Sequence, residues 1–89
     1  MDRIGTIRSR LEENLQPIEL TITDDSHRHA GHPGARDGRG HFSIRITSPA
    51  FDGLTPLARH RAVYAALGEL MQTDIHALAI DARTSTESQ

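Results

Sequence analysis

The chain has 89 residues and no cysteine, which excludes disulfide bonds, thiolate metal sites and thiol catalysis by this chain alone. Its formal net charge is −2, so no overall electrostatic attraction draws it to nucleic acid. No apolar run approaches 18 residues, so we expect no membrane span. The N-terminus, MDRIGTIRSR, lacks the apolar region of a signal peptide, so we expect a cytoplasmic location.

The first element that the sequence predicts is an amphipathic helix. Residues 2–15 carry a stripe formed by Ile4, Ile7, Leu11 and Leu15, whose spacing predicts an amphipathic helix. Pro17 should end that helix and push Gln16 toward extended geometry.

Two alternating segments follow, and each predicts a half-buried strand. The first covers residues 18–24, with Ile18, Leu20 and Ile22 on its apolar side, and the second begins at His41 and points Phe42, Ile44 and Ile46 inward. Strands joined by one loop are most simply an antiparallel pair.

A second helix is predicted from Thr55-Pro56, a hydroxyl N-cap followed by proline at the first helical position, to about Met71. Residues 75–82 form the third strand, with Leu78, Ile80 and Ala82 on one side. A helical crossover between strands favours a parallel connection. The predicted fold is therefore a small α+β sandwich of one domain, residues 1–84, with a flexible tail at 85–89.

The loop at residues 25–40 concentrates candidate ligands. It contains His27, His29 and His32, and His41 follows at the start of the second strand. Neutral imidazole is the commonest metal ligand, although solvated surface histidines explain the pattern equally well. Two parallel strands begin at the same end of a sheet, so the topology should bring His76 toward this loop, as a ligand or as a strand-end histidine bonded to backbone.

The other histidines and the arginines have structural explanations that compete with functional ones. We expect His41 to hydrogen-bond the base of the loop and His60 to be a satisfied helix histidine. Arg59 and Arg61, with Arg36, Arg39 and Arg45, are either a phosphate-contacting patch or ordinary solvated arginines. No phosphate loop, nucleophile elbow or paired-carboxylate site is visible, so we do not expect an enzyme.

Several segments together resemble the BolA family. The run DSHRHAGH at residues 25–32 resembles the family's DESHKHAGH segment, and Gly40-His41-Phe42 looks like its strand-start HF. Residues 51–64 resemble its FxGLxxxxRHRxVY signature, and residues 75–78 its IHAL motif. The motifs occur in the family's order and cover about residues 3–84.

This resemblance implies a KH-like (class II) αββαβ fold, a three-stranded mixed sheet covered on one face by two helices. It implies a monomer that pairs with a monothiol CGFS glutaredoxin and shares a [2Fe-2S] cluster with it and with glutathione, for cluster trafficking or for iron and stress sensing. The implied ligands are His76 and a loop histidine, His29 first, then His32, with His27 behind them. The alternative is a DNA-binding regulator of stress response and morphology, with Arg59 and Arg61 as contacts.

Overall fold

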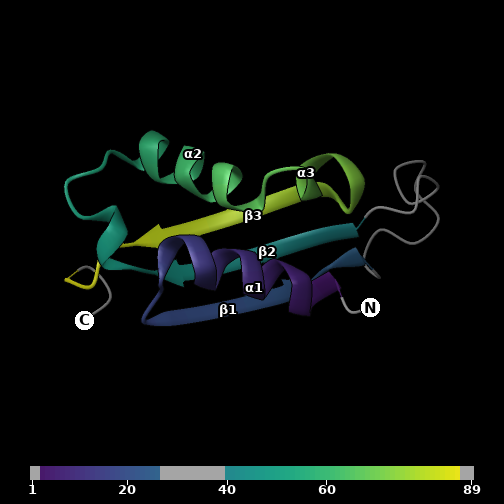
Figure 1. Ribbon diagram of the computed structural model, residues 1–89, viewed down its shortest axis with the longest axis horizontal. Coiled ribbons are helices and arrows are strands. Elements are labelled where there is room, and N and C mark those ends of the chain that lie inside the picture. The colour runs from purple at the N-terminus through teal and green to yellow at the C-terminus, as the bar shows by residue number, and fades with distance from the viewer. Residues whose placement is uncertain (1–2, 27–39, 87–89) are drawn as a thin grey trace.

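The computed structural model describes residues 3–26 and 40–86 (Figure 1). Its elements are, in chain order, α1 (Arg3–Leu15), β1 (Glu19–Asp24), β2 (Gly40–Thr47), the 3₁₀ turn η3 (Pro49–Phe51), α2 (Pro56–Leu67), α3 (Leu70–Thr73) and β3 (Ile75–Arg83). Within the described ranges, every helix is too short or too polar to cross a bilayer.

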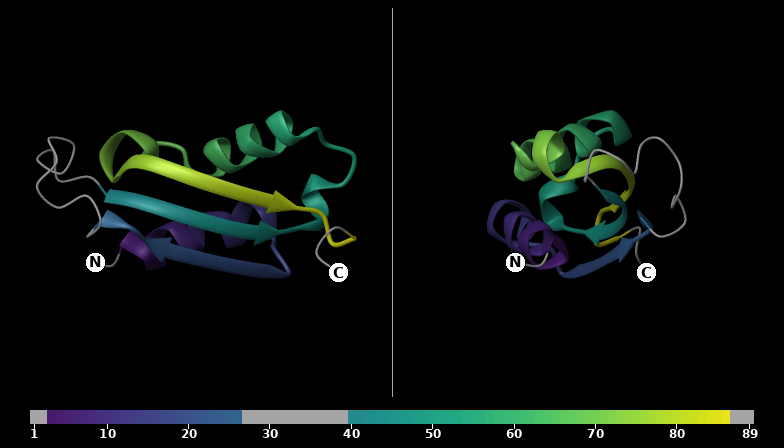
Figure 2. Two further views of the ribbon diagram at one scale, coloured as in Figure 1. Left: turned by 180° about the vertical axis from the view of Figure 1, so that it is seen from behind. Right: turned by 90° about the vertical axis from the view of Figure 1, so that its right-hand side faces the viewer.

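The three strands form one sheet in the order β1-β2-β3. β1 runs antiparallel to β2, with Leu20 opposite Ile46, and β2 runs parallel to β3, with Ile44 opposite Ile80. Both predicted strand directions are confirmed. Helices α1 and α2 lie against the same face of the sheet, and no described helix covers the other face, which we call the open face (Figure 2).

The core between helices and sheet is aliphatic apart from two phenylalanines. On β2 the alternation holds along the strand, because Phe42, Ile44 and Ile46 are buried while Arg45 is exposed. Phe51 in η3 is fully buried and closes the far end of this layer. The remaining buried apolar residues come from the helices and from the start of β3: Ile7, Leu11, Leu15, Val63, Ala66, Leu67, Leu70 and Ile75.

The second helix starts as predicted but ends early. The Thr55 hydroxyl accepts a hydrogen bond from the Ala58 amide at 3.1 Å, and Pro56 opens α2. The prediction of one helix to Met71 was wrong, because Gly68 adopts φ +55° and separates α2 from α3. Glycine reaches this left-handed region without steric cost and commonly ends helices.

Two predictions between α1 and β1 were also wrong. Gln16 is not extended: it has φ +46°, and its amide donates to the Glu12 carbonyl, which is the geometry of a left-handed helix cap. Ile18 is 60% exposed, because the strand begins one residue later and leaves this side chain outside the core. At the other end of the chain, β3 continues to Arg83, one residue beyond its predicted end, and Thr84 is buried.

Candidate functional site

The end of β1 and the starts of β2 and β3 meet at one end of the sheet. Asp24 pairs with Phe42, and Gly40 pairs with Ile75. We call this end the rim and define it as Asp25, Ser26, Gly40, His41 and His76. Residues 27–39, which lie outside the described residues, join Ser26 to Gly40 and therefore start and finish at the rim.

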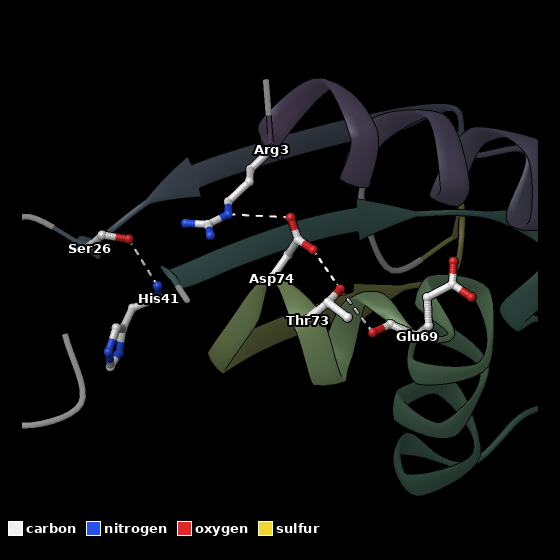
Figure 3. Close-up of polar contacts among 6 residues, drawn as sticks. All are labelled: Arg3, Ser26, His41, Glu69, Thr73 and Asp74. Carbon is white, nitrogen blue, oxygen red and sulfur yellow. Dashed lines mark hydrogen bonds and ion pairs between the residues drawn. The ribbon is translucent and has the colours of Figure 1, made fainter. Parts of the chain in front are cut away.

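Hydrogen bonds to main-chain groups fix the two chain ends of the rim. The Ser26 hydroxyl accepts from the His41 amide at 3.0 Å (Figure 3), and the Asp25 amide donates to the His41 carbonyl at 2.7 Å. The Gly40 amide donates to the Asp74 carbonyl at 2.8 Å. His41 does hydrogen-bond the base of the loop as predicted, and it uses its main chain to do so.

A charged turn holds the start of β3. Asp74 accepts from the Thr73 hydroxyl at 2.6 Å and from Arg3 Nε at 3.4 Å, which ties the turn to the beginning of α1 (Figure 3). The Thr73 hydrogen bond, followed by the hydrogen bond and positive charge of Arg3, holds the pKa of Asp74 below its ordinary value despite some desolvation. Hydrogen bonds from Thr73 and from Arg3 therefore hold the turn that precedes His76.

His76 lies in an irregularity of the β2–β3 ladder. Gly40 pairs with Ile75 and the next residue, His41, pairs with Ala77, so β3 has one additional residue at that point. Such a bulge re-aims a side chain and is common beside functional sites. His76 is exposed, and its ring centroid lies 5.1 Å from that of His41, with the ring planes at 51°. The predicted juxtaposition of the two strand starts is confirmed.

The other predicted metal ligands cannot be placed, because His27, His29 and His32 lie outside the described residues. Within residues 3–26 and 40–86, no group of three or more His, Cys, Asp or Glu side chains has a geometry that could hold a metal ion. Any site built on His76 that needs more than two side-chain donors must draw the others from outside the described residues or from another molecule.

The basic residues of α2 divide into two kinds. Arg59 donates from Nε to the Leu54 carbonyl at 3.0 Å and from a terminal nitrogen to the Ala82 carbonyl at 3.3 Å, so it ties α2 to β3. Arg61 is exposed on the same helix, and His60 is partly buried. Arg45 lies on the open sheet face, 3.7 Å from Asp81, while Arg36 and Arg39 lie outside the described residues.

The open face of the sheet has two shallow hollows. The larger, about 380 Å³, includes Asp81, whose pKa is held below its ordinary value chiefly by the hydrogen bond from Arg83. The smaller, about 260 Å³, adjoins the rim and is lined by Asp25, His41, Phe42, Ser43, Ala77, Leu78 and Ala79. The Ser43 hydroxyl donates to the Asp25 carboxylate there.

Sequence reasoning missed the approach of the His41 ring to His76. Strand parity was the available signal, because His41 precedes the inward-facing Phe42 and must therefore point to the open face. The bulge that turns His76 toward it leaves no mark in the residue pattern.

Comparison with known proteins identifies the family. The model of the BolA-like protein family matches residues 11–87. The chain is 41% identical over 90 residues to protein BOLA1, chloroplastic, of Arabidopsis thaliana, covering 98% of this chain and 56% of that protein. It is 46% identical over 83 residues to BolA-like protein 1 of Homo sapiens, covering 93% and 58%. The chain thus spans a little more than half of these two relatives.

A bacterial relative and a solved structure agree. The DNA-binding transcriptional regulator BolA of Escherichia coli is 39% identical over 85 residues, covering 91% of this chain and 78% of that protein. The solved structure of BolA1 from Arabidopsis thaliana superposes with a TM-score of 0.84 at 37% identity, covering 100% of this chain and 99% of that one. The chain therefore belongs to the BolA family.

Proposed function

We propose that this chain pairs with a monothiol CGFS glutaredoxin and supplies histidine ligands to a shared [2Fe-2S] cluster. One observation carries the proposal: the exposed imidazole of His76 stands on the rim where the histidine-rich segment starts and finishes. The hydrogen-bonded turn at Asp74 and the β-bulge at His76 place that imidazole at the end of the sheet, where a second protein can reach it.

Covalent reach supports a loop histidine as the second ligand. An extended chain spans at most about 3.3–3.6 Å per residue, so the Cα atom of residue 29 stays within about 11 Å of that of Ser26. The same limit is about 22 Å for residue 32. The tether therefore restricts His29 more tightly than His32, as the family resemblance orders these two. It restricts His27 most tightly of the three, so the rank of His27 rests on the resemblance alone.

The metal-binding atoms of this chain support a cluster that is shared with other molecules and not one held by this chain alone. A chain with no cysteine offers no thiolate, whereas [2Fe-2S] clusters are held by cysteine thiolates, with histidine as a partial replacement. The resemblance assigns one thiolate to glutaredoxin and one to glutathione, which leaves two positions for His76 and a loop imidazole. Histidine ligation raises the cluster's reduction potential, and it requires a deprotonated ring, so this chain should release its share at low pH.

Cluster reconstitution tests this proposal. The chain is mixed with a CGFS glutaredoxin, glutathione, iron and sulfide, and the visible circular dichroism spectrum is compared with that of glutaredoxin alone. We expect a heterodimer with a distinct spectrum, from a chain that is a monomer without a cluster when alone. His76→Ala should remove or reshape the spectrum, and His60→Ala on α2 is the matched control.

The loop ligand is identified by the same spectrum. Of His27→Ala, His29→Ala and His32→Ala, we expect His29→Ala to have the largest effect. An unchanged spectrum in His76→Ala would remove that residue from the ligand set, and equal, small effects of all three loop variants would mean that no single loop histidine is required.

A second candidate function is DNA-binding transcriptional regulation, which the similarity to the Escherichia coli regulator favours. Because Arg59 is engaged with two carbonyls, Arg61 is the sharper probe of DNA binding by α2. In a gel shift, Arg61→Ala should lower the slope of log affinity against log salt by about 0.9 for each phosphate that the variant no longer neutralises. Absence of binding at low salt would count against this function.

A further inference from the structure

We propose that His41 and His76 together form a two-imidazole site for one tetrahedral divalent metal ion in the protein without glutaredoxin, with zinc as its probe. The site shares His76 with the proposed function, but it needs no residue between 27 and 39, no cluster and no second protein, so it can be tested separately.

The separation of the two rings fits one shared ion. Zinc binds histidine nitrogen at about 2.0–2.1 Å, which places the ring centre about 3.2 Å from the ion. Two such rings at a tetrahedral angle have centres about 5.2 Å apart. The observed centroid separation is 5.1 Å, so the two backbones need not approach further.

The two residues combine a fixed and an adjustable donor. The main chain of His41 is held at its amide by Ser26 and at its carbonyl by Asp25. His76 is exposed, and the χ2 torsion of histidine is broad, so its ring can turn a nitrogen toward the ion without leaving its rotamer. The main chain of His41 is therefore fixed, and the two rings need only rotate for a nitrogen of each to face one ion.

The space beside His41 suits a hydrated cation. The hollow that it lines, which His76 does not line, has a volume of about 260 Å³, several times the roughly 30 Å³ that one water occupies in the liquid. Two of its walls are the small side chains Ala77 and Ala79, and Asp25 places a carboxylate on a third. That negative charge attracts a cation, and water supplies the coordination positions that the two imidazoles leave open.

The imidazole pair also selects the class of ion. Imidazole suits zinc, copper and nickel, whereas calcium and magnesium require oxygen ligands. The tetrahedral ring separation favours zinc, which has four-coordinate tetrahedral geometry in most protein sites. Zinc is spectroscopically silent, so the histidine rings themselves provide the readout.

Nuclear magnetic resonance of the ¹⁵N-labelled rings tests the proposal. Zinc alone is titrated into the full chain and into a variant with His27→Ala, His29→Ala and His32→Ala combined. In both proteins we expect the ring nitrogens of His41 and His76 to shift together and to saturate at one zinc per chain, while those of His60 stay in place. Stationary His41 signals, or loss of the shift in the combined variant, would overturn the proposal.

Affinity provides the second readout. His41→Gln and His76→Gln should each weaken zinc binding by more than about tenfold. Removing a residue that hydrogen-bonds a metal ligand already costs about tenfold or more, and removing the ligand itself should cost at least as much. His60→Gln should leave the affinity unchanged. Far-ultraviolet circular dichroism checks the fold of each variant, and if His41→Gln unfolds, the exposed His76→Gln and the ring shifts of the wild-type protein decide the question. Unchanged zinc affinity in a folded His76→Gln variant would refute the site.

Discussion

Gly40 is the residue on which the geometry of the rim depends most sharply. A Cβ atom at this position would lie 2.7 Å from Phe42 Cε2 and 2.8 Å from both Phe42 Cζ and Ser26 Oγ. Ordinary contact begins at 3.4 Å, so each neighbour would have to move by about 0.6–0.7 Å. The Phe42 ring is 2% exposed within the core, and the Ser26 hydroxyl accepts the His41 amide, so neither can move without loss.

The cost of Gly40→Ala follows from these clashes. Overpacking a core costs about 1–3 kcal/mol, and a displaced hydrogen bond about 1 kcal/mol. The narrower unfolded ensemble of alanine returns about 0.4–1 kcal/mol. We therefore expect the free energy of unfolding to fall by about 1–3.6 kcal/mol, which corresponds to a urea midpoint lower by about 1–2 M.

Urea unfolding followed by far-ultraviolet circular dichroism measures this loss, since the chain has no tryptophan. Ser26→Ala is the matched partner, because it removes one of the two clashing groups. The double variant Ser26→Ala with Gly40→Ala should lose less unfolding free energy than the two single variants lose in total, by at least about 0.5 kcal/mol. A Gly40→Ala protein within about 0.5 kcal/mol of wild type would refute the steric reasoning.

Three further predictions concern the frame around the site. Phe51→Ala should lower the free energy of unfolding by about 3–5 kcal/mol, whereas Ile18→Ala, at an exposed apolar side chain, should change it by less than about 0.5 kcal/mol; urea midpoints of the two variants check both. Thr55→Ala removes the N-cap of α2 and should cost about 1 kcal/mol, while Thr55→Ser should retain most of that stability in the same assay. Asp74 has a pKa lowered chiefly by Thr73, so its contribution to stability is present above the unfolded value of about 3.9 and is lost as pH falls through the folded value. The stability difference between wild type and Asp74→Asn should therefore shrink below about pH 4, and a difference that grows on acidification would contradict the assignment.

Periodicity was enough to predict the strands and their directions. Alternation around Leu20 and Ile44 marked two strands, and the helical crossover favoured a third strand parallel to the second. This topology alone placed His76 near the start of β2. The fold and the meeting of the two strand starts could thus be predicted from the sequence.

The local backbone could not be predicted as well. Gly68 lies within an apolar stripe that continues helical spacing into Leu70 and Met71, and only its positive φ reveals the break. Gln16 shows the same effect, since the left-handed cap outweighs the preference of a residue before proline. Both outcomes depend on how the chain must turn to pack the next element, which residue patterns do not record.

The sequence predicts which helices and strands carry the residues of the candidate site, but it does not predict the contacts that these residues make. Arg59 shows the limit, because a basic cluster in sequence does not reveal that one guanidinium ties two carbonyls of its own chain. His41 shows the converse, since a residue assigned to the loop base also brings its ring to His76. Such contacts depend on register and on one additional residue in a strand.

The central claim is that an imidazole of this chain binds iron in a cluster completed by another protein. Pulsed electron paramagnetic resonance of the reduced complex tests it most directly, with ¹⁵N-histidine in this chain and unlabelled glutaredoxin. We predict ¹⁵N couplings to the cluster that weaken in His76→Ala and persist in His60→Ala. A cluster without ¹⁵N coupling, or one whose coupling is the same in His76→Ala, would contradict the account.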